Sequence, residues 1–276
     1  MSAGKWGDLG LRSLSAAILI PAVLLNVWAG GIWFNLFVGL LGVLIALEWT
    51  TMVHRQDPAQ FALHAAGAMC GALLPLEVGV AGAGLAIGVL WLISAVFAWF
   101  QDSSGAMWRY LGVPYAGIPA IALVLLRNDA DYGIAAIIWV MVIVWAADIL
   151  AYFSGRIIGG PKLAPVISPK KTLAGLGGAI VGSATASVIL GLIMGNSALV
   201  ILAVLAAGFA VVEQGGDLFK SALKRHYGVK DSGRLIPGHG GVIDRVDGLI
   251  AVATVAALIG AMRGGFDATG AGLLVW

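Results

Sequence analysis

Two long stretches of this sequence contain no charged residue at all. One lies between Arg12 and Glu48, and the other lies between Lys171 and Glu213. A helix needs about 20 mostly apolar residues to cross the hydrocarbon core of a bilayer, so both stretches are long enough to cross it. Only 11% of the residues are charged, whereas soluble domains have about 25%. These features predict an all-α, polytopic integral membrane protein.

Apolar segments separated by glycines and charges predict about nine transmembrane helices. The predicted spans are 13–29, 32–52, 60–76, 79–101, 110–126, 132–153, 173–194, 198–219 and 243–263. Two breaks are marked by Gly30–Gly31 and by Gly195–Ser197. The basic N-terminus resembles a signal peptide, but no convincing small-residue cleavage site follows, so the first span is expected to be retained.

The positions of the bases orient these spans. With nine crossings, fourteen of the sixteen Lys and Arg residues fall on the same side as the N-terminus. They are Lys5, Arg12, Arg55, Arg109, Arg156, Lys162, Lys170, Lys171, Lys220, Lys224, Arg225, Lys230, Arg234 and Arg245; Arg127 and Arg263 fall on the other side. Because basic loops stay in the cytoplasm, we expect a cytoplasmic N-terminus in the inner membrane.

The chain is uneven along its length. Residues 1–130 are expected to form a transmembrane scaffold of five spans, and residues 131–276 a catalytic region with cytoplasmic loops 154–172 and 220–242. The single cysteine, Cys70, excludes an internal disulfide and a four-cysteine zinc site. Gly178 and Gly182 have the spacing of a close helix-packing face.

Acidic residues lie in or at the ends of several predicted spans. The five in the catalytic region are Asp148, Glu213, Asp217, Asp244 and Asp247. A carboxylate in the membrane is costly and commonly lines a functional cavity. Asp217 and Asp244 are placed to meet around a magnesium ion, which prefers oxygen ligands. A proton relay or ordinary helix capping is the alternative, and Glu48 and Glu77 are expected simply to reach the interface.

Residues 221–248 hold eight of the thirty charged residues. Lys224, Arg225, Lys230 and Arg234 precede a glycine turn that contains His239, Gly240 and Gly241. Bare backbone N–H groups at a helix N-terminus bind anions, so this pattern predicts a polyphosphate site. A self-neutralising patch of ion pairs is the alternative. The segment Ser168–Thr172, with the sequence SPKKT, is predicted to bind phosphate as well.

The stretch from Ser221 to Asp247 resembles the signature of the phosphatidate cytidylyltransferases, also called CDP-diacylglycerol synthases. That signature reads S-x-apolar-K-R-x4-K-D-x-small-x2-apolar-P-x-H-G-G-apolar-x-D-R-apolar-D, and this sequence fits it without a mismatch. The resemblance extends over roughly 145–250 and includes Gly216–Leu218, Asp148, Tyr152 and SPKKT. It departs at Leu173–Ala174, where many members of the family have Trp-Glu.

The resemblance implies cytidylyl transfer from CTP to phosphatidate, which gives CDP-diacylglycerol and pyrophosphate with Mg²⁺. It implies that Asp217, Asp244 and Asp247 hold the metal. It implies catalytic or phosphate-binding roles for Lys224, Arg225, Lys230, Asp231 and His239. It implies substrate contacts for Ser168, Lys170, Lys171, Thr172, Ser221, Gly240, Gly241 and Arg245. A second cation and a homodimer stay open, membrane lipid is an expected partner, and no nucleic acid is expected.

Two other functions fit parts of the pattern. A CTP-dependent lipid-alcohol kinase would use a similar site but release CDP instead of pyrophosphate. An ion-coupled transporter also carries intramembrane acids and glycine breaks, but its charges would lie near mid-membrane in paired repeats. Here the charges gather toward one predicted face, which favours chemistry at the membrane surface.

Overall fold

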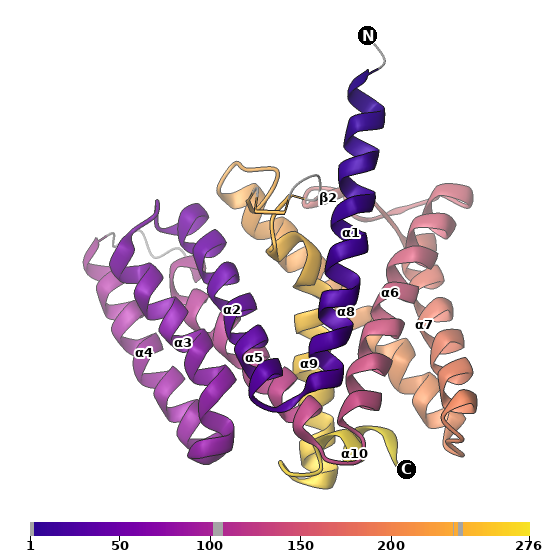
Figure 1. Cartoon of the computed structure of the whole chain (residues 1–276). Helices are drawn as coiled ribbons and strands as arrows, with labels where there is room; N and C mark the ends of the chain where they lie inside the picture. Colours follow the sequence, from indigo (N-terminus) through magenta and orange to yellow (C-terminus); the bar gives the residue numbers. More distant parts are fainter. Residues whose placement is uncertain (1–2, 102–106, 234, 237–239) are drawn as a thin grey trace. The chain divides into compact units, whose positions relative to one another are not determined.

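The computed structural model describes residues 3–101, 107–233, 235–236 and 240–276 (Figure 1). The chain divides into two compact units. Unit 1 comprises Met1–Val124 and His226–Val246, and unit 2 comprises Leu125–Arg225 and Asp247–Trp276. Two predicted site residues, Arg234 and His239, lie outside the described residues.

Unit 1 is built on a layer of antiparallel apolar helices. Its helices are α1 (Ala3–Ala29), α2 (Gly31–Val53), α3 (Pro58–Glu77), α4 (Gly79–Gln101), the short 3₁₀ helix η1 (Met107–Tyr110) and most of α5 (Gly112–Asn128). Figure 1 shows α2, α3 and α4 side by side, and α3 packs against both neighbours. Gly30 has φ 63°, a left-handed conformation that glycine adopts without strain, and it separates α1 from α2 as predicted.

Unit 2 is organised around a close pair of helices. Its elements are α6 (Gly133–Ile157), β1 (Lys162–Ala164), β2 (Ser168–Thr172), α7 (Leu173–Ile193), most of α8 (Leu199–His226), most of α9 (Ile243–Gly264) and α10 (Thr269–Leu274). α6 and α7 lie side by side (Figure 1). A Cβ on Gly178 would overlap the side chain of Ser154, and one on Gly182 would lie 2.8 Å from Cβ of Leu150. The predicted packing role of the two glycines is therefore confirmed.

The predicted cytoplasmic loops contain more regular structure than the sequence indicated. Within 154–172, β1 and β2 form an antiparallel hairpin that pairs Lys162 with Thr172. The other loop was predicted to begin at residue 220, but α8 continues to His226. Residues 220–226 of that predicted loop are thus helical, and the loop boundary at the membrane stays a prediction. Lys220 and Lys224 therefore lie on a helix.

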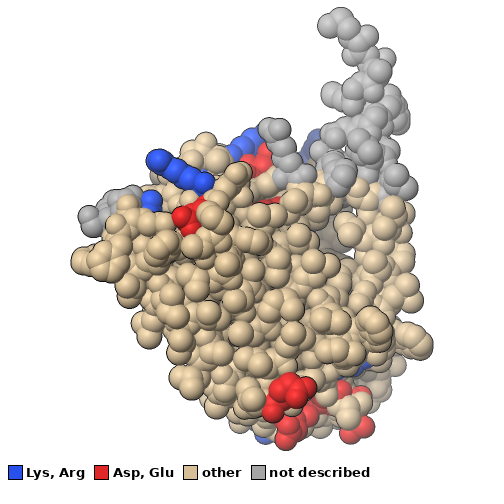
Figure 2. Space-filling view, turned by 60° about the vertical axis from the view of Figure 1, so that its left-hand side comes forward, with Lys and Arg blue, Asp and Glu red and all other residues tan. Residues whose placement is uncertain are grey.

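Seven helices of the described chain are long and apolar enough to cross a membrane. The predicted spans 13–29 and 110–126 correspond to shorter apolar helical segments, Ala17–Ala29 and Gly112–Asn128, so the count of nine stays a prediction. Many large apolar side chains, such as Leu85, Phe100 and Val204, are exposed. Figure 2 shows a broad surface without charged side chains, which gather at its margins. Exposed apolar surface on this scale indicates a multi-pass membrane protein.

Candidate active site

A chain of alternating charges lies at one end of the helices of unit 2. Nζ of Lys171 lies 2.5 Å from Oδ2 of Asp217, and Oδ1 of Asp217 lies 2.7 Å from Nζ of Lys220. The same ammonium lies 2.7 Å from Oδ2 of Asp247. Two cations and two carboxylates thus alternate in one connected row, which we call the ion-pair chain. The structure brings together the predicted residues Lys171, Asp217 and Asp247.

Small residues place the two aspartates on closely packed helices. Gly216 precedes Asp217 on α8, and a Cβ at Gly216 would lie 2.8 Å from the carbonyl oxygen of Asp247. Gly248 follows Asp247 on α9, and a Cβ there would lie 2.8 Å from Cγ of Glu213. The absence of side chains at both glycines lets the helices approach, and one lysine can then contact both carboxylates.

The ion-pair chain is graded in its exposure. The side chains of Lys220 and Asp247 are 7% and 10% exposed, while those of Lys171 and Asp217 are 19% and 24% exposed. Charged groups in a low-dielectric interior are stable only when they are paired. Lys220 thus forms the buried end of the chain, and Lys171 with Asp217 forms the end that water or a ligand reaches first.

Gln214 extends this network along α8. Nζ of Lys171 donates to Oε1 of Gln214 at 2.7 Å, and Nε2 of Gln214 donates to Oε2 of Glu213 at 2.7 Å. Both Glu213 and Gln214 are buried. Lys171 is therefore held by two acceptors, Asp217 and Gln214, and its ammonium is fixed in position.

The SPKKT segment delivers Lys171 from strand β2. Thr172 is the N-cap of α7, and its Oγ1 accepts a hydrogen bond of 3.0 Å from the N–H of Gly175. This capping role was not part of the prediction, and it fixes the residue that follows Lys171. Ser168 is half-buried, and Lys170 is exposed on the same strand. Their substrate contacts stay a prediction.

In unit 1, a buried carboxylate organises the glycine-rich loop. Glu48 of α2 is 2% exposed and accepts hydrogen bonds from the backbone N–H groups of Val242 at 2.7 Å and Ile243 at 2.9 Å. The hydroxyl of Ser232 lies 2.8 Å from Oε2 of Glu48. We expected Glu48 to reach the membrane interface, and this was wrong, because its carboxylate finds backbone donors inside the protein.

Asp244 is tied to the same loop. Its Oδ2 accepts a hydrogen bond of 2.9 Å from the N–H of Ser232 and lies 3.0 Å from the Ser232 hydroxyl oxygen. Ser232 is buried between Asp244 and Glu48. One oxygen of the Asp244 carboxylate is therefore used to hold the loop.

The glycine turn differs from the simple anion cradle that the sequence suggested. Gly240 has φ 83°, and its carbonyl accepts a hydrogen bond of 3.0 Å from the N–H of Ile236. A Cβ on Gly241 would overlap the hydroxyl of Ser232 and lie 2.6 Å from Oε2 of Glu48. Because Glu48 occupies two N–H groups at the start of α9, those groups are not available to a phosphate. Contacts from Gly240 and Gly241 themselves stay predicted.

The other predicted residues are distributed along α8, the loop that follows and the start of α9. Ser221 and Lys224 are half-buried on α8, whereas Arg225, Lys230, Asp231 and Arg245 are exposed. Exposed cations beside the ends of apolar helices can meet a soluble anion or a lipid headgroup. Their individual roles stay predictions.

The carboxylates of unit 2 have the chemistry of a divalent-cation site. Among the described residues, no three His, Cys, Asp or Glu side chains gather as a metal cluster. Asp217 and Asp247 nevertheless both contact one ammonium, so a positive charge already lies between their oxygens. Carboxylate oxygens around a cation are the donor set that magnesium prefers, and the two aspartates fit that group.

Sequence reasoning missed four residues of these networks: Glu48, Gln214, Lys220 and Ser232. Lys220 lies three residues after Asp217, a helical spacing that could have identified the pair. We counted Lys220 only among the cytoplasmic bases. Glu48 gave no comparable signal, because its partner Val242 is 194 positions away in the sequence.

The comparisons with known proteins agree with these observations. The profile of the cytidylyltransferase family matches residues 10–262. A phosphatidate cytidylyltransferase of Brucella abortus is 41% identical over 92% of this chain and 94% of its own. Those of Pseudomonas aeruginosa and Thermotoga maritima are 37% and 29% identical over 90% and 91% of this chain and 95% and 96% of theirs.

A multi-pass helical membrane protein with paired carboxylates and lysines at its helix ends is thus similar to these enzymes over nearly its whole length. The chain belongs to the cytidylyltransferase family. The resemblance of residues 221–247 to the phosphatidate cytidylyltransferases is confirmed, and it extends well beyond that signature.

Proposed function

We propose that this chain transfers the cytidylyl group of CTP to phosphatidate and releases pyrophosphate. Family membership over residues 10–262 carries this proposal, together with three relatives that bear this activity in their names. A phosphate oxygen of phosphatidate attacks the α-phosphorus of CTP, and the bond from that phosphorus to the bridging oxygen breaks. CDP-diacylglycerol and pyrophosphate are then the only products.

The ion-pair chain supports this reaction by its charges. Phosphatidate already carries an anionic oxygen, so the attack needs no strong base; it needs the repulsion between two phosphorylated substrates to be screened. Lys171 is the more exposed cation and is placed to exchange a carboxylate partner for a phosphate oxygen. Lys220 stays buried, keeps the aspartates in place and adds positive charge beneath the substrates.

Mg²⁺ is part of the proposal. Asp217 and Asp247, with Asp244 as a further ligand, would hold it, and bound metal would neutralise the triphosphate and the leaving pyrophosphate. The chain's own residues supply positioning: Gln214 and Asp217 hold Lys171, and Glu48 and Ser232 hold the loop that carries Asp244. Aligned substrates contribute much of the acceleration in phosphoryl chemistry.

The proposal includes the location of the reaction. From the distribution of the basic residues we infer that the ion-pair chain lies at the cytoplasmic face of the inner membrane, where CTP is present in the water and phosphatidate in the lipid. Purified protein should convert phosphatidate and labelled CTP to CDP-diacylglycerol only when Mg²⁺ is added. If the labelled cytidine instead stays in the water phase as CDP, the protein is a kinase.

A further inference from the structure

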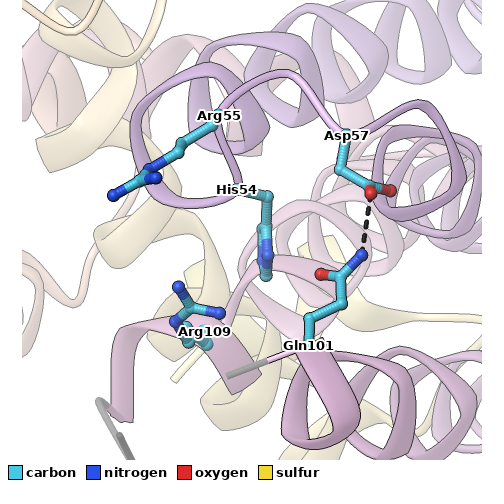
Figure 3. Close-up of a pocket in the computed structure, with 5 residues that line it drawn as sticks. All are labelled: His54, Arg55, Asp57, Gln101 and Arg109. Atoms are coloured by element: carbon cyan, nitrogen blue, oxygen red, sulfur yellow. Dashed lines mark hydrogen bonds between the residues drawn. The ribbon is translucent and has the colours of Figure 1, made fainter.

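Unit 1 contains a polar pocket that the proposed transfer reaction does not use. It has a volume of about 290 Å³ and is lined by His54, Arg55, Asp57, Gln101 and Arg109 (Figure 3). These residues come from the end of α2, the start of α3, the end of α4 and η1. The pocket therefore lies where apolar helices end, at the depth where a membrane meets water.

His54 is the unusual member of this pocket. Its side chain is buried, with 7% of its surface exposed, and neither ring nitrogen makes a well-aligned hydrogen bond among the described residues, although the backbone of Arg109 lies close to the ring. In Figure 3 the imidazole points between Arg109 and Gln101. A buried polar group without a partner costs about 1–3 kcal/mol, so such groups in native proteins are commonly satisfied by a ligand or by water.

The charges around His54 favour an anion. Burial, together with the positive charge of Arg109, lowers the pKa of His54 to about 4, although the backbone of Arg109 opposes part of this change. The ring is therefore neutral at pH 7 and offers one N–H donor. The ring of His54 also contacts the ring of His64 in an edge arrangement, at 5.3 Å between centroids.

Asp57 does not cancel the attraction for an anion. Its Oδ1 accepts a hydrogen bond from the N–H of Gln60 at 2.8 Å, and its Oδ2 accepts one from Nε2 of Gln101 at 2.7 Å (Figure 3). The hydrogen bond from Gln60 is the main cause that lowers the pKa of Asp57, which is therefore ionised at pH 7. Among the described residues that line the pocket, two guanidinium groups and one carboxylate sum to one net positive charge.

We propose that this pocket binds the phosphate group of a phosphate monoester or of free phosphate, held by Arg55 and Arg109 and by the N–H of His54. Guanidinium groups bind phosphate through paired hydrogen bonds, and a neutral imidazole completes the set with one more donor. Two sources share this chemistry: the headgroup of an anionic phospholipid and a soluble phosphate ion. The site is independent of the proposed transfer reaction and does not need CTP or Mg²⁺.

Native mass spectrometry of the whole protein in an uncharged detergent, without CTP and Mg²⁺, tests this site. One arm uses dioctanoyl phosphatidate with dioctanoyl phosphatidylcholine as its reference, and the other uses inorganic phosphate. In at least one arm, the double variant Arg55→Gln/Arg109→Gln should bind one phosphate-bearing molecule fewer than the wild type. Loss in the lipid arm alone identifies a headgroup, loss in the phosphate arm alone identifies a soluble ion, and loss in both identifies phosphate recognition as such.

Further single variants supply the control and test the individual pocket residues. Arg156→Gln removes an exposed cation that lies over the Tyr152 ring in unit 2, and it should bind as the wild type does. His54→Phe should weaken binding about tenfold or more, and His54→Gln, which keeps an N–H donor, should weaken it less. If the double variant does not fold, Arg55→Gln alone replaces it in the test, because Arg55 is exposed and its substitution should preserve folding. Equal binding by the wild type and all pocket variants, or equal losses with Arg156→Gln, would overturn the proposal.

Discussion

Lys220 and Asp247 form an ion pair in which Nζ of the lysine lies 2.7 Å from Oδ2 of the aspartate. The same ammonium lies 2.7 Å from Oδ1 of Asp217. A single cation therefore contacts two carboxylates and links α8 to α9 within unit 2. Since Lys220 is only 7% exposed, water cannot replace it cheaply if it is removed.

Lys220→Met should destabilise the protein and reduce its activity. The substitution keeps the length of the side chain but leaves two carboxylates facing each other. Breaking a buried ion pair costs about 3–5 kcal/mol, and the 24% exposure of Asp217 reduces this, so we expect a loss of about 2–4 kcal/mol. Thermal unfolding in detergent measures the change, with Lys220→Arg as the control that keeps the charge. A Lys220→Met protein as stable as the wild type would contradict the role of the ion-pair chain.

Asp217→Asn and Asp244→Asn should each reduce turnover about 100-fold or more at every Mg²⁺ concentration, because a lost metal ligand removes several kcal/mol of charge stabilisation. Asp131→Asn changes an exposed acid between α5 and α6 and is the matched control. If Asp244 only holds Ser232, an asparagine oxygen can still accept those hydrogen bonds. Half the wild-type activity in Asp244→Asn would therefore exclude it as a metal ligand.

Glu48→Gln should loosen the glycine-rich loop. A carboxylate accepts hydrogen bonds at both oxygens, from Val242 and Ile243, whereas a glutamine would turn an NH₂ group toward one of these donors. Losing a buried acceptor in this way costs about 1–3 kcal/mol. Glu77→Gln is the control, because Glu77 is an acid at the end of a helix that remains exposed. Thermal unfolding and the KM for CTP should change only in Glu48→Gln, and equal behaviour of the two variants would count against this role.

Hydropathy and glycine breaks predicted the helices well, because both report on local properties of the chain. The residue types and the family resemblance predicted Lys171, Asp217 and Asp247 in one site. They did not predict that Lys220 joins the two aspartates. The role of Glu48 could not be predicted, since it depends on tertiary contact with a loop far away in the sequence. The same contact explains why the N–H groups of Val242 and Ile243, at the start of α9, are not available to a phosphate.

The predicted topology can be tested on either side of α7. Ser197 follows α7 and is exposed, whereas Val166 precedes it at the tip of the hairpin and is 90% exposed. In a Cys70→Ala background, a membrane-impermeant thiol reagent applied to intact cells should label Ser197→Cys. It should label Val166→Cys only after the membrane is permeabilised. The reverse pattern would invert the orientation inferred from the basic residues.

The central claim is tested most directly by the products formed from CTP labelled with ³²P at the α-phosphate. Purified wild-type protein, phosphatidate and Mg²⁺ should place the label in CDP-diacylglycerol in the lipid phase and release one pyrophosphate for each labelled lipid. A chelator should stop both. Label that remains in CDP in the water phase, without pyrophosphate, would contradict cytidylyl transfer.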